Sequence, residues 1–77
     1  MPTILLVNGF RFFFYSNDHL HKHIHVEKDN CIAKYNVSPI ELVYSKGFKA
    51  TELKKIRSII IGNVDLIESK WDEYFNN

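Results

Sequence analysis

The chain has 77 residues, of which 45% are hydrophobic, and ten Lys and Arg against nine Asp and Glu give a formal net charge of +1. This apolar content excludes a disordered chain, and the near-neutral charge excludes the global basic field of a general nucleic-acid binder. We expect a single domain over residues 1–77, whose stability is limited because so short a chain buries only about 60% of its unfolded surface.

The cysteine content and the N-terminal segment bear on the cellular compartment. Cys31 is the single cysteine and cannot form an internal disulfide, which favours a reducing cytoplasm. The apolar run from Ile4 to Val7 is stopped by Asn8-Gly9 and is too short for a signal peptide or a membrane span. We therefore expect a cytoplasmic protein without a membrane segment.

The first expected element is a β-hairpin that pairs residues 3–7 with residues 10–15, because Asn8-Gly9 accepts the positive φ angles of a type I′ turn. One face then carries the pairs Val7 with Phe10, Leu5 with Phe12 and Thr3 with Phe14. The other face carries Leu6 with Arg11 and Ile4 with Phe13. Both faces are largely apolar and one helix cannot cover both, so we expect self-association or a small partner protein at this hairpin.

A second hairpin is expected from residues 23–28 and 31–37 around Asp29-Asn30. Its inward positions are Ile24, Val26, Ala33 and Tyr35, and its outward positions are His23, His25, Glu27, Lys34 and Asn36. The register places His25 opposite Lys34 and His23 opposite Asn36 on an exposed face. Replacing either histidine by Ala should then cost about 0.5 kcal/mol or less.

Two helices are expected after the hairpins. Ser38-Pro39-Ile40-Glu41 has the form of a capping box, which predicts a short helix over residues 39–46 ended by Gly47. Beyond Phe48, apolar residues recur in steps of three and four and predict one long amphipathic helix: Leu53, Ile56, Ile60, Val64, Ile67, Trp71 and Tyr74. Gly62 inside this stripe predicts a bend or a close backbone contact. The expected fold class is α+β, with a four-stranded, mainly antiparallel sheet of two hairpins followed by a short and a long helix.

Several segments carry a family resemblance over nearly the whole chain: Met1-Pro2-Thr3-Ile4, Gly9-Phe10-Arg11-Phe12, Asp18-His19, His23-Ile24-His25-Val26, Gly47-Phe48 and Glu52-Leu53. Together they resemble the bacterial domain-of-unknown-function 4160 family. The resemblance implies a small stand-alone protein, often encoded beside a second small protein in what has been suggested to be a toxin–antitoxin pair. This chain departs from the family pattern at His21-Lys22, where Pro-Pro is typical, and at Lys49, where a capping Ser is typical.

The histidines offer a candidate metal site. His19, His21, His23 and His25 stand at every second position, and two on a strand lie about 6.5–7 Å apart at Cα. His23 and His25 could chelate Zn²⁺ with His19, Asp18 or Glu27 as the third ligand. The alternative is a solvated strand face that binds no cofactor.

The same face also allows acid–base chemistry on a phosphodiester. His23 and His25 would exchange protons near neutral pH while Lys34 stabilises phosphate charge, which suits metal-independent RNA cleavage. These three residues are the catalytic candidates. No nucleophile with an orienting carboxylate is evident, so the sequence leaves open whether the chain is an enzyme.

Charge is unevenly distributed in the C-terminal half. The cations of residues 46–57 are Lys46, Lys49, Lys54, Lys55 and Arg57, which with Glu52 make this segment net +4, whereas residues 58–77 are net −3. This order opposes the helix macrodipole, so helix stability does not explain it. A phosphate backbone or an acidic partner could, and a solvated helix face is the alternative.

Three functions from different classes therefore remain. The first is an interaction module of a two-protein system, which we prefer because of the doubly apolar hairpin and the resemblance. The second is an RNA-directed binder or nuclease that uses the His/Lys face, and the third is a metal-binding protein.

Overall fold

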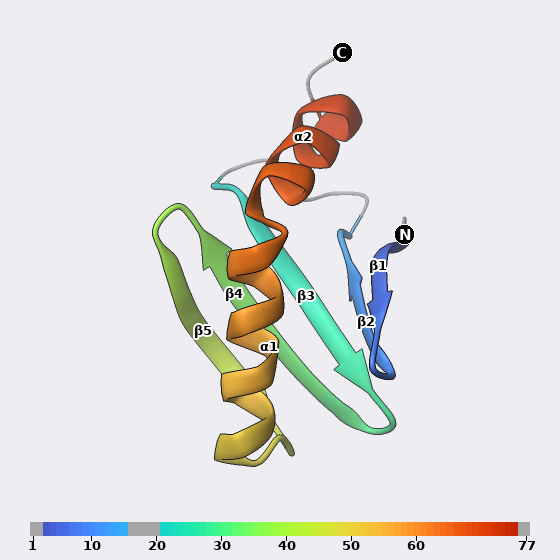
Figure 1. Cartoon of the computed structure of the whole chain (residues 1–77). Coiled ribbons are helices and arrows are strands. Elements are labelled where there is room, and N and C mark those ends of the chain that lie inside the picture. The colour runs from blue at the N-terminus through green and yellow to red at the C-terminus, as the bar shows by residue number, and fades with distance from the viewer. Residues whose placement is uncertain (1–2, 16–20, 76–77) are drawn as a thin grey trace.

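A five-stranded antiparallel sheet followed by two helices makes up the computed structural model, which describes residues 3–15 and 21–75 (Figure 1). The strands follow one another across the sheet in chain order: β1 (Thr3–Val7), β2 (Phe10–Phe13), β3 (His23–Lys28), β4 (Cys31–Val37) and β5 (Ile40–Lys46). The helices are α1 (Ala50–Gly62) and α2 (Val64–Phe75). The α+β class is confirmed, and the sheet has one strand more than the sequence predicted.

The first hairpin forms around the predicted turn. Asn8 and Gly9 have φ angles of 52° and 84°, as a type I′ turn requires. The pairs next to the turn are those expected, up to Leu5 with Phe12. A bulge then shifts the register, so that Thr3 pairs with Phe13 instead of Phe14. The expected pairing was therefore wrong at this end of the hairpin.

The second hairpin has the predicted register throughout. His23 pairs with Asn36, and His25 pairs with Lys34. Because side chains alternate along a strand, this pairing turns Ile24 and Val26 to one face and both histidines to the other.

Residues 40–46 form strand β5, so the prediction of a short helix over residues 39–46 was wrong. Ser38 and Pro39 form the turn between β4 and β5, with a cis peptide bond between them. Pairing begins with Val37 and Ile40 and includes a bulge after Leu42. The capping-box pattern is a local signal of about 1 kcal/mol, whereas seven residues rich in β-formers gain a hydrogen-bonded ladder along β4.

The predicted long helix is two helices that meet at Asn63. Its backbone N–H donates to Ile60 O at 3.1 Å and its side-chain Nδ2 donates to Ile59 O at 2.8 Å, which satisfies carbonyls at the end of α1. Its own carbonyl accepts the Ile67 N–H at 2.9 Å and so begins α2. The bend expected at Gly62 is present, but a Cβ on Gly62 would meet nothing within 4 Å, so no close backbone contact accompanies it.

The start of α1 keeps the Glu half of a capping box without a capping Ser. The Lys49 N–H donates to Glu52 Oε1 at 3.0 Å, and the Leu53 N–H donates to Lys49 O at 3.0 Å. The Glu52 carboxylate thus accepts from the backbone N–H of the N-cap residue, while the Lys49 side chain offers no acceptor to the first-turn N–H groups as a Ser or Asp cap would.

The core lies between one face of the sheet and the helices. The buried sheet residues of this helix-covered face are Phe10, Phe12, Ile24, Val26, Ala33 and Tyr35, and the helices bury Ile56, Ile60, Ile67 and Trp71 against them. Figure 1 shows α1 crossing the sheet and α2 continuing past the end where β3 begins. Among the described residues, the opposite face of the sheet is met by a helix only where Trp71 of α2 reaches the start of β3, and we call it the open face. Neither helix of the described chain is long and apolar enough to cross a bilayer.

Candidate functional sites

The open face is ordered in rows that run across the strands. One row joins Thr3, Phe13, His25, Lys34 and Tyr44 through directly paired positions of all five strands. A second row joins Leu6, Arg11, Glu27, Ile32 and Lys46. A shorter third row joins His23, Asn36 and Glu41. The sequence thus placed the catalytic candidates His23, His25 and Lys34 on the correct face.

Both histidines are buried, at 7% exposure each, so the expectation of an exposed pair was wrong. The His25 ring stacks on Phe13 with centroids 5.6 Å apart and meets the edge of Tyr15 at 4.4 Å. The His23 ring lies 5.1 Å from the indole of Trp71, which reaches it from α2. The rings lie 5.1 Å from each other. Aromatic side chains from β2 and α2 thus cover a strand face that alternation alone marks as polar.

The hydrogen bond made by the His23 ring shows which of its two nitrogens carries the proton. Its Nδ1 lies 2.7 Å from His21 O, and because a carbonyl only accepts, Nδ1 must carry the proton. In the neutral ring the lone pair then sits on Nε2. The Nε2 atoms of both His23 and His25 are buried, so an external ligand reaches them only if the side chains that cover them move.

Glu27, the carboxylate two residues after His25, forms an ion pair with Arg11. The Arg11 guanidinium donates to Glu27 Oε2 at 3.1 Å and to Thr3 Oγ1 at 2.8 Å, and it lies 4.4 Å from the centroid of the Phe13 ring. Glu27, a candidate third zinc ligand, is therefore held by Arg11. The described residues contain no group of three His, Cys, Asp or Glu arranged to hold a metal ion. His19 and Asp18 lie outside the described residues, so the three-ligand zinc site stays a prediction.

The predicted basic segment is divided among several places. Lys46 ends β5 opposite Ile32, and Lys49 stands at the start of α1. Lys54 and Lys55 line a surface groove of about 330 Å³ together with Asn8, Ser58 and Ile59. Arg57 lies near Tyr35 instead. Burial raises the pKa of the Tyr35 phenol, and the Arg57 charge partly opposes this increase.

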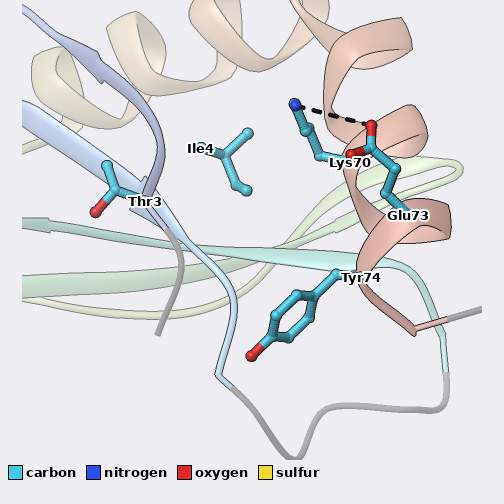
Figure 2. Close-up of a pocket in the computed structure, with 5 residues that line it drawn as sticks. All are labelled: Thr3, Ile4, Lys70, Glu73 and Tyr74. Carbon is cyan, nitrogen blue, oxygen red and sulfur yellow. Dashed lines mark ion pairs between the residues drawn. The ribbon is translucent and has the colours of Figure 1, made fainter.

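A second cavity, of about 280 Å³, lies between β1 and α2 (Figure 2). Thr3 and Ile4 contribute from β1, and Lys70, Glu73 and Tyr74 contribute from α2. Lys70 Nζ and Glu73 Oε2 are 3.7 Å apart, an exposed pair that contributes little to stability. Sequence reasoning missed this cavity because the residues on its two sides are more than 60 positions apart in the sequence.

The outer edge of the sheet at β5 was also missed, since residues 40–46 were expected to be helical. Strand β5 pairs with β4 alone in the described chain. Leu42, Val43 and Tyr44 are 45%, 47% and 46% exposed. Three consecutive apolar side chains are therefore about half open to solvent along an unpaired strand edge.

These features define a class of protein: a small α+β domain whose antiparallel sheet is covered by helices on one face and open on the other. The chain belongs to the DUF4160 family, a domain of unknown function, whose sequence model matches residues 9–72. The resemblance expected from the sequence is thereby confirmed. No curated protein and no solved structure matches the chain.

Proposed function

We propose that the chain is an interaction module of a two-protein system and that β5 is the strand that contacts the partner. The observation that carries the proposal is the exposed run Leu42–Val43–Tyr44 on a strand whose outer edge has no neighbour among the described residues. Such an edge offers unpaired N–H and C=O groups to an incoming strand, and its side chains supply specificity.

The occupant we propose is an extended, apolar segment of a second protein. Glu41 lies near the start of β5 and Lys46 ends it, so an antiparallel segment with a basic residue near Glu41 and an acidic residue near Lys46 would complement both ends. The bulge in β5 interrupts its regular ladder. Bulges are one means by which edge strands avoid indiscriminate pairing, which supports a specific partner over stacking of many copies.

The first hairpin supports a partner less than the sequence suggested. Phe13, on its second face, is only 3% exposed, because Arg11, Tyr15 and His25 cover it within the chain. Leu6 alone stays widely open there, at 72% exposure. On this second face, Leu6 is therefore the apolar side chain that a partner would still have to cover.

Co-expression with the product of the neighbouring gene tests the proposal. The two proteins should co-purify, and expressing each alone should affect growth differently from expressing both. Leu42→Lys combined with Tyr44→Lys should abolish co-purification, whereas the matched control Leu6→Lys should retain it. Loss with Leu6→Lys and retention with the β5 variant would instead place the contact on the first hairpin.

Hydrogen exchange adds a readout that does not depend on substitutions. Amides of residues 40–46 should become protected when the partner binds, while those of residues 3–7 should not change. Failure to co-purify, with unchanged exchange in β5, would overturn the proposal.

A further inference from the structure

A groove of about 330 Å³ lies between the β1–β2 turn and α1, and strands β3 and β4 separate this turn from the proposed contact strand β5. Asn8 closes one side, and Lys54, Lys55, Ser58 and Ile59 form the other. The helical spacing explains this wall, since Lys54 and Ser58, and Lys55 and Ile59, are each four residues apart and lie along one side of the helix. Ile59 packs against the core from this side and gives the groove an apolar floor.

A third lysine lies at the same turn. Lys28 Nζ sits 4.7 Å from the centroid of the Phe10 ring, and the side chain passes so close to Gly9 that a Cβ there would lie 3.2 Å from Lys28 Cε. The backbone conformation of Asn8-Gly9, both with positive φ, brings the turn to this position. Three ammonium-bearing side chains, Lys28, Lys54 and Lys55, are therefore associated with one turn and one helix side.

Among residues 3–15 and 21–75, no carboxylate lines the groove, and none of their ion pairs uses Lys28, Lys54 or Lys55. Lys54 and Lys55 are neighbours of like charge within α1, so they do not stabilise the helix through each other. The polar groups beside them, the Ser58 hydroxyl and the Asn8 amide, can both donate hydrogen bonds. The described lining of the groove thus combines cations and hydrogen-bond donors and contributes no anion.

We propose that this groove binds a phosphate group, with Lys54 and Lys55 as the charged ligands and Asn8 and Ser58 as neutral donors. Phosphate offers several strong acceptor oxygens and a negative charge, which match this set. Free phosphate and the backbone of a ribonucleic acid share this chemistry, and the experiment below distinguishes them. The site is independent of the partner contact at β5, because it uses neither that strand nor its edge.

The test is titration of the full chain with inorganic phosphate and with a short oligouridylate, followed by NMR chemical shifts at fixed salt. Lys54→Gln combined with Lys55→Gln should weaken binding at least about tenfold, because two charge-assisted contacts are lost. The control pair Lys46→Gln and Lys70→Gln removes the same charge elsewhere and should weaken it less than about threefold. Melting temperatures of both pairs should match that of the parent chain.

Asn8→Gly gives a second variant that keeps the turn, since Gly accepts the same positive φ, and removes the amide donor. It should weaken binding of the same ligand. Tighter binding of oligouridylate than of phosphate assigns the site to a nucleic-acid backbone, and equal binding assigns it to free phosphate. Equal losses in the groove pair and the control pair would overturn the proposal, as would binding of a polyglutamate peptide with no binding of either phosphate ligand.

Discussion

Burial of His23 and His25 changes what their substitution should do. The His23 imidazole packs against two other rings and the His25 imidazole against three, and these contacts are lost when the ring is removed. We expect His25→Ala to lower the free energy of unfolding by about 1–3 kcal/mol, more than an exposed residue would cost. Urea denaturation measures this value.

His21→Ala is the matched control for the histidine prediction. The His21 side chain is exposed, and its backbone carbonyl, which accepts the bond from His23, is kept in the variant. Its stability should stay within about 0.5 kcal/mol of the parent. Equal and negligible effects of His21→Ala and His25→Ala would show that the His25 ring is exposed in solution.

Tyr35 is the other residue whose protonation is tied to the fold. Its hydroxyl donates to Leu53 O at 3.2 Å, and burial raises its pKa above the ordinary value of 10.0, against the opposing effect of Arg57. A raised folded-state pKa means that the folded protein holds this proton more tightly than the unfolded chain. The resulting stabilisation is complete below pH 10.0 and is lost as the pH rises through the folded-state pKa.

Tyr35→Phe should therefore cost about 0.5–1.5 kcal/mol at pH 7, because the hydrogen bond is lost. Above pH 10 the variant should lose stability less steeply than the parent, since it lacks the ionising group. Urea midpoints measured from pH 7 to 11 check both effects, with Tyr44→Phe, a change at an exposed tyrosine, as the control. Parallel pH profiles for Tyr35→Phe and the parent would contradict this account.

At the scale of elements, local sequence signals predicted the secondary structure correctly where they agreed with the pairing of strands in the sheet. The Asn8-Gly9 turn and the alternation of Ile24, Val26, Ala33 and Tyr35 specified two hairpins, because turn type and side-chain period both fix register. The Ser38-Pro39 segment failed because a capping pattern and a strand turn share the same residues. Only the pairing of residues 40–46 with β4, a contact between segments, decides between them.

Gly47 shows how one residue fits two interpretations. The sequence analysis predicted that Gly47 ends a helix, but in the structure it directly follows β5. Both positions use a positive φ, which here is 94°. A Cβ at this position would also lie 2.8 Å from Cys31 Sγ. The glycine is thus required both by the backbone angle and by the close approach of β4.

Gly47→Ala should lower the free energy of unfolding by about 1–3 kcal/mol, because it adds both strain and a clash. Gly62→Ala is the control, since a Cβ there meets nothing within 4 Å and Ala favours helix by up to about 1 kcal/mol. The melting temperature should therefore fall for Gly47→Ala and rise for Gly62→Ala. Adding Cys31→Ala to Gly47→Ala should recover only part of the loss, because the φ strain stays. A neutral Gly47→Ala would contradict the conformation of this corner.

At the scale of the whole molecule, the sequence predicted the core better than the candidate sites. The stripe from Leu53 to Trp71 is a local pattern, and its central residues Ile56, Ile60 and Ile67 are buried as expected. The sites depend instead on segments distant in sequence: Trp71 covers His23, and Asn8 lines one groove with Lys54 and Lys55. Periodicity indicates which face a residue occupies but not what reaches over that face.

Trp71 joins three parts of the molecule. Its ring lies 5.2 Å from Phe14 after β2, 5.1 Å from His23 in β3 and 4.3 Å from Phe75 in its own helix. Lys22 Nζ and Asp72 Oδ1, 3.3 Å apart, reinforce the same junction as an exposed ion pair. Loss of the indole should therefore weaken the packing of α2 on the sheet as well as open a cavity.

Trp71→Ala should lower the free energy of unfolding by about 3–5 kcal/mol. At about 0.05–0.15 kcal/mol per residue, a domain of this length has about 4–12 kcal/mol in total, so the variant should lose a large share of its stability and melt at a much lower temperature. Leu66→Ala, at an exposed position of the same helix, should change stability by less than about 1 kcal/mol. Circular dichroism melts of the three proteins decide the question. An unchanged melting temperature for Trp71→Ala would mean that α2 does not depend on this contact.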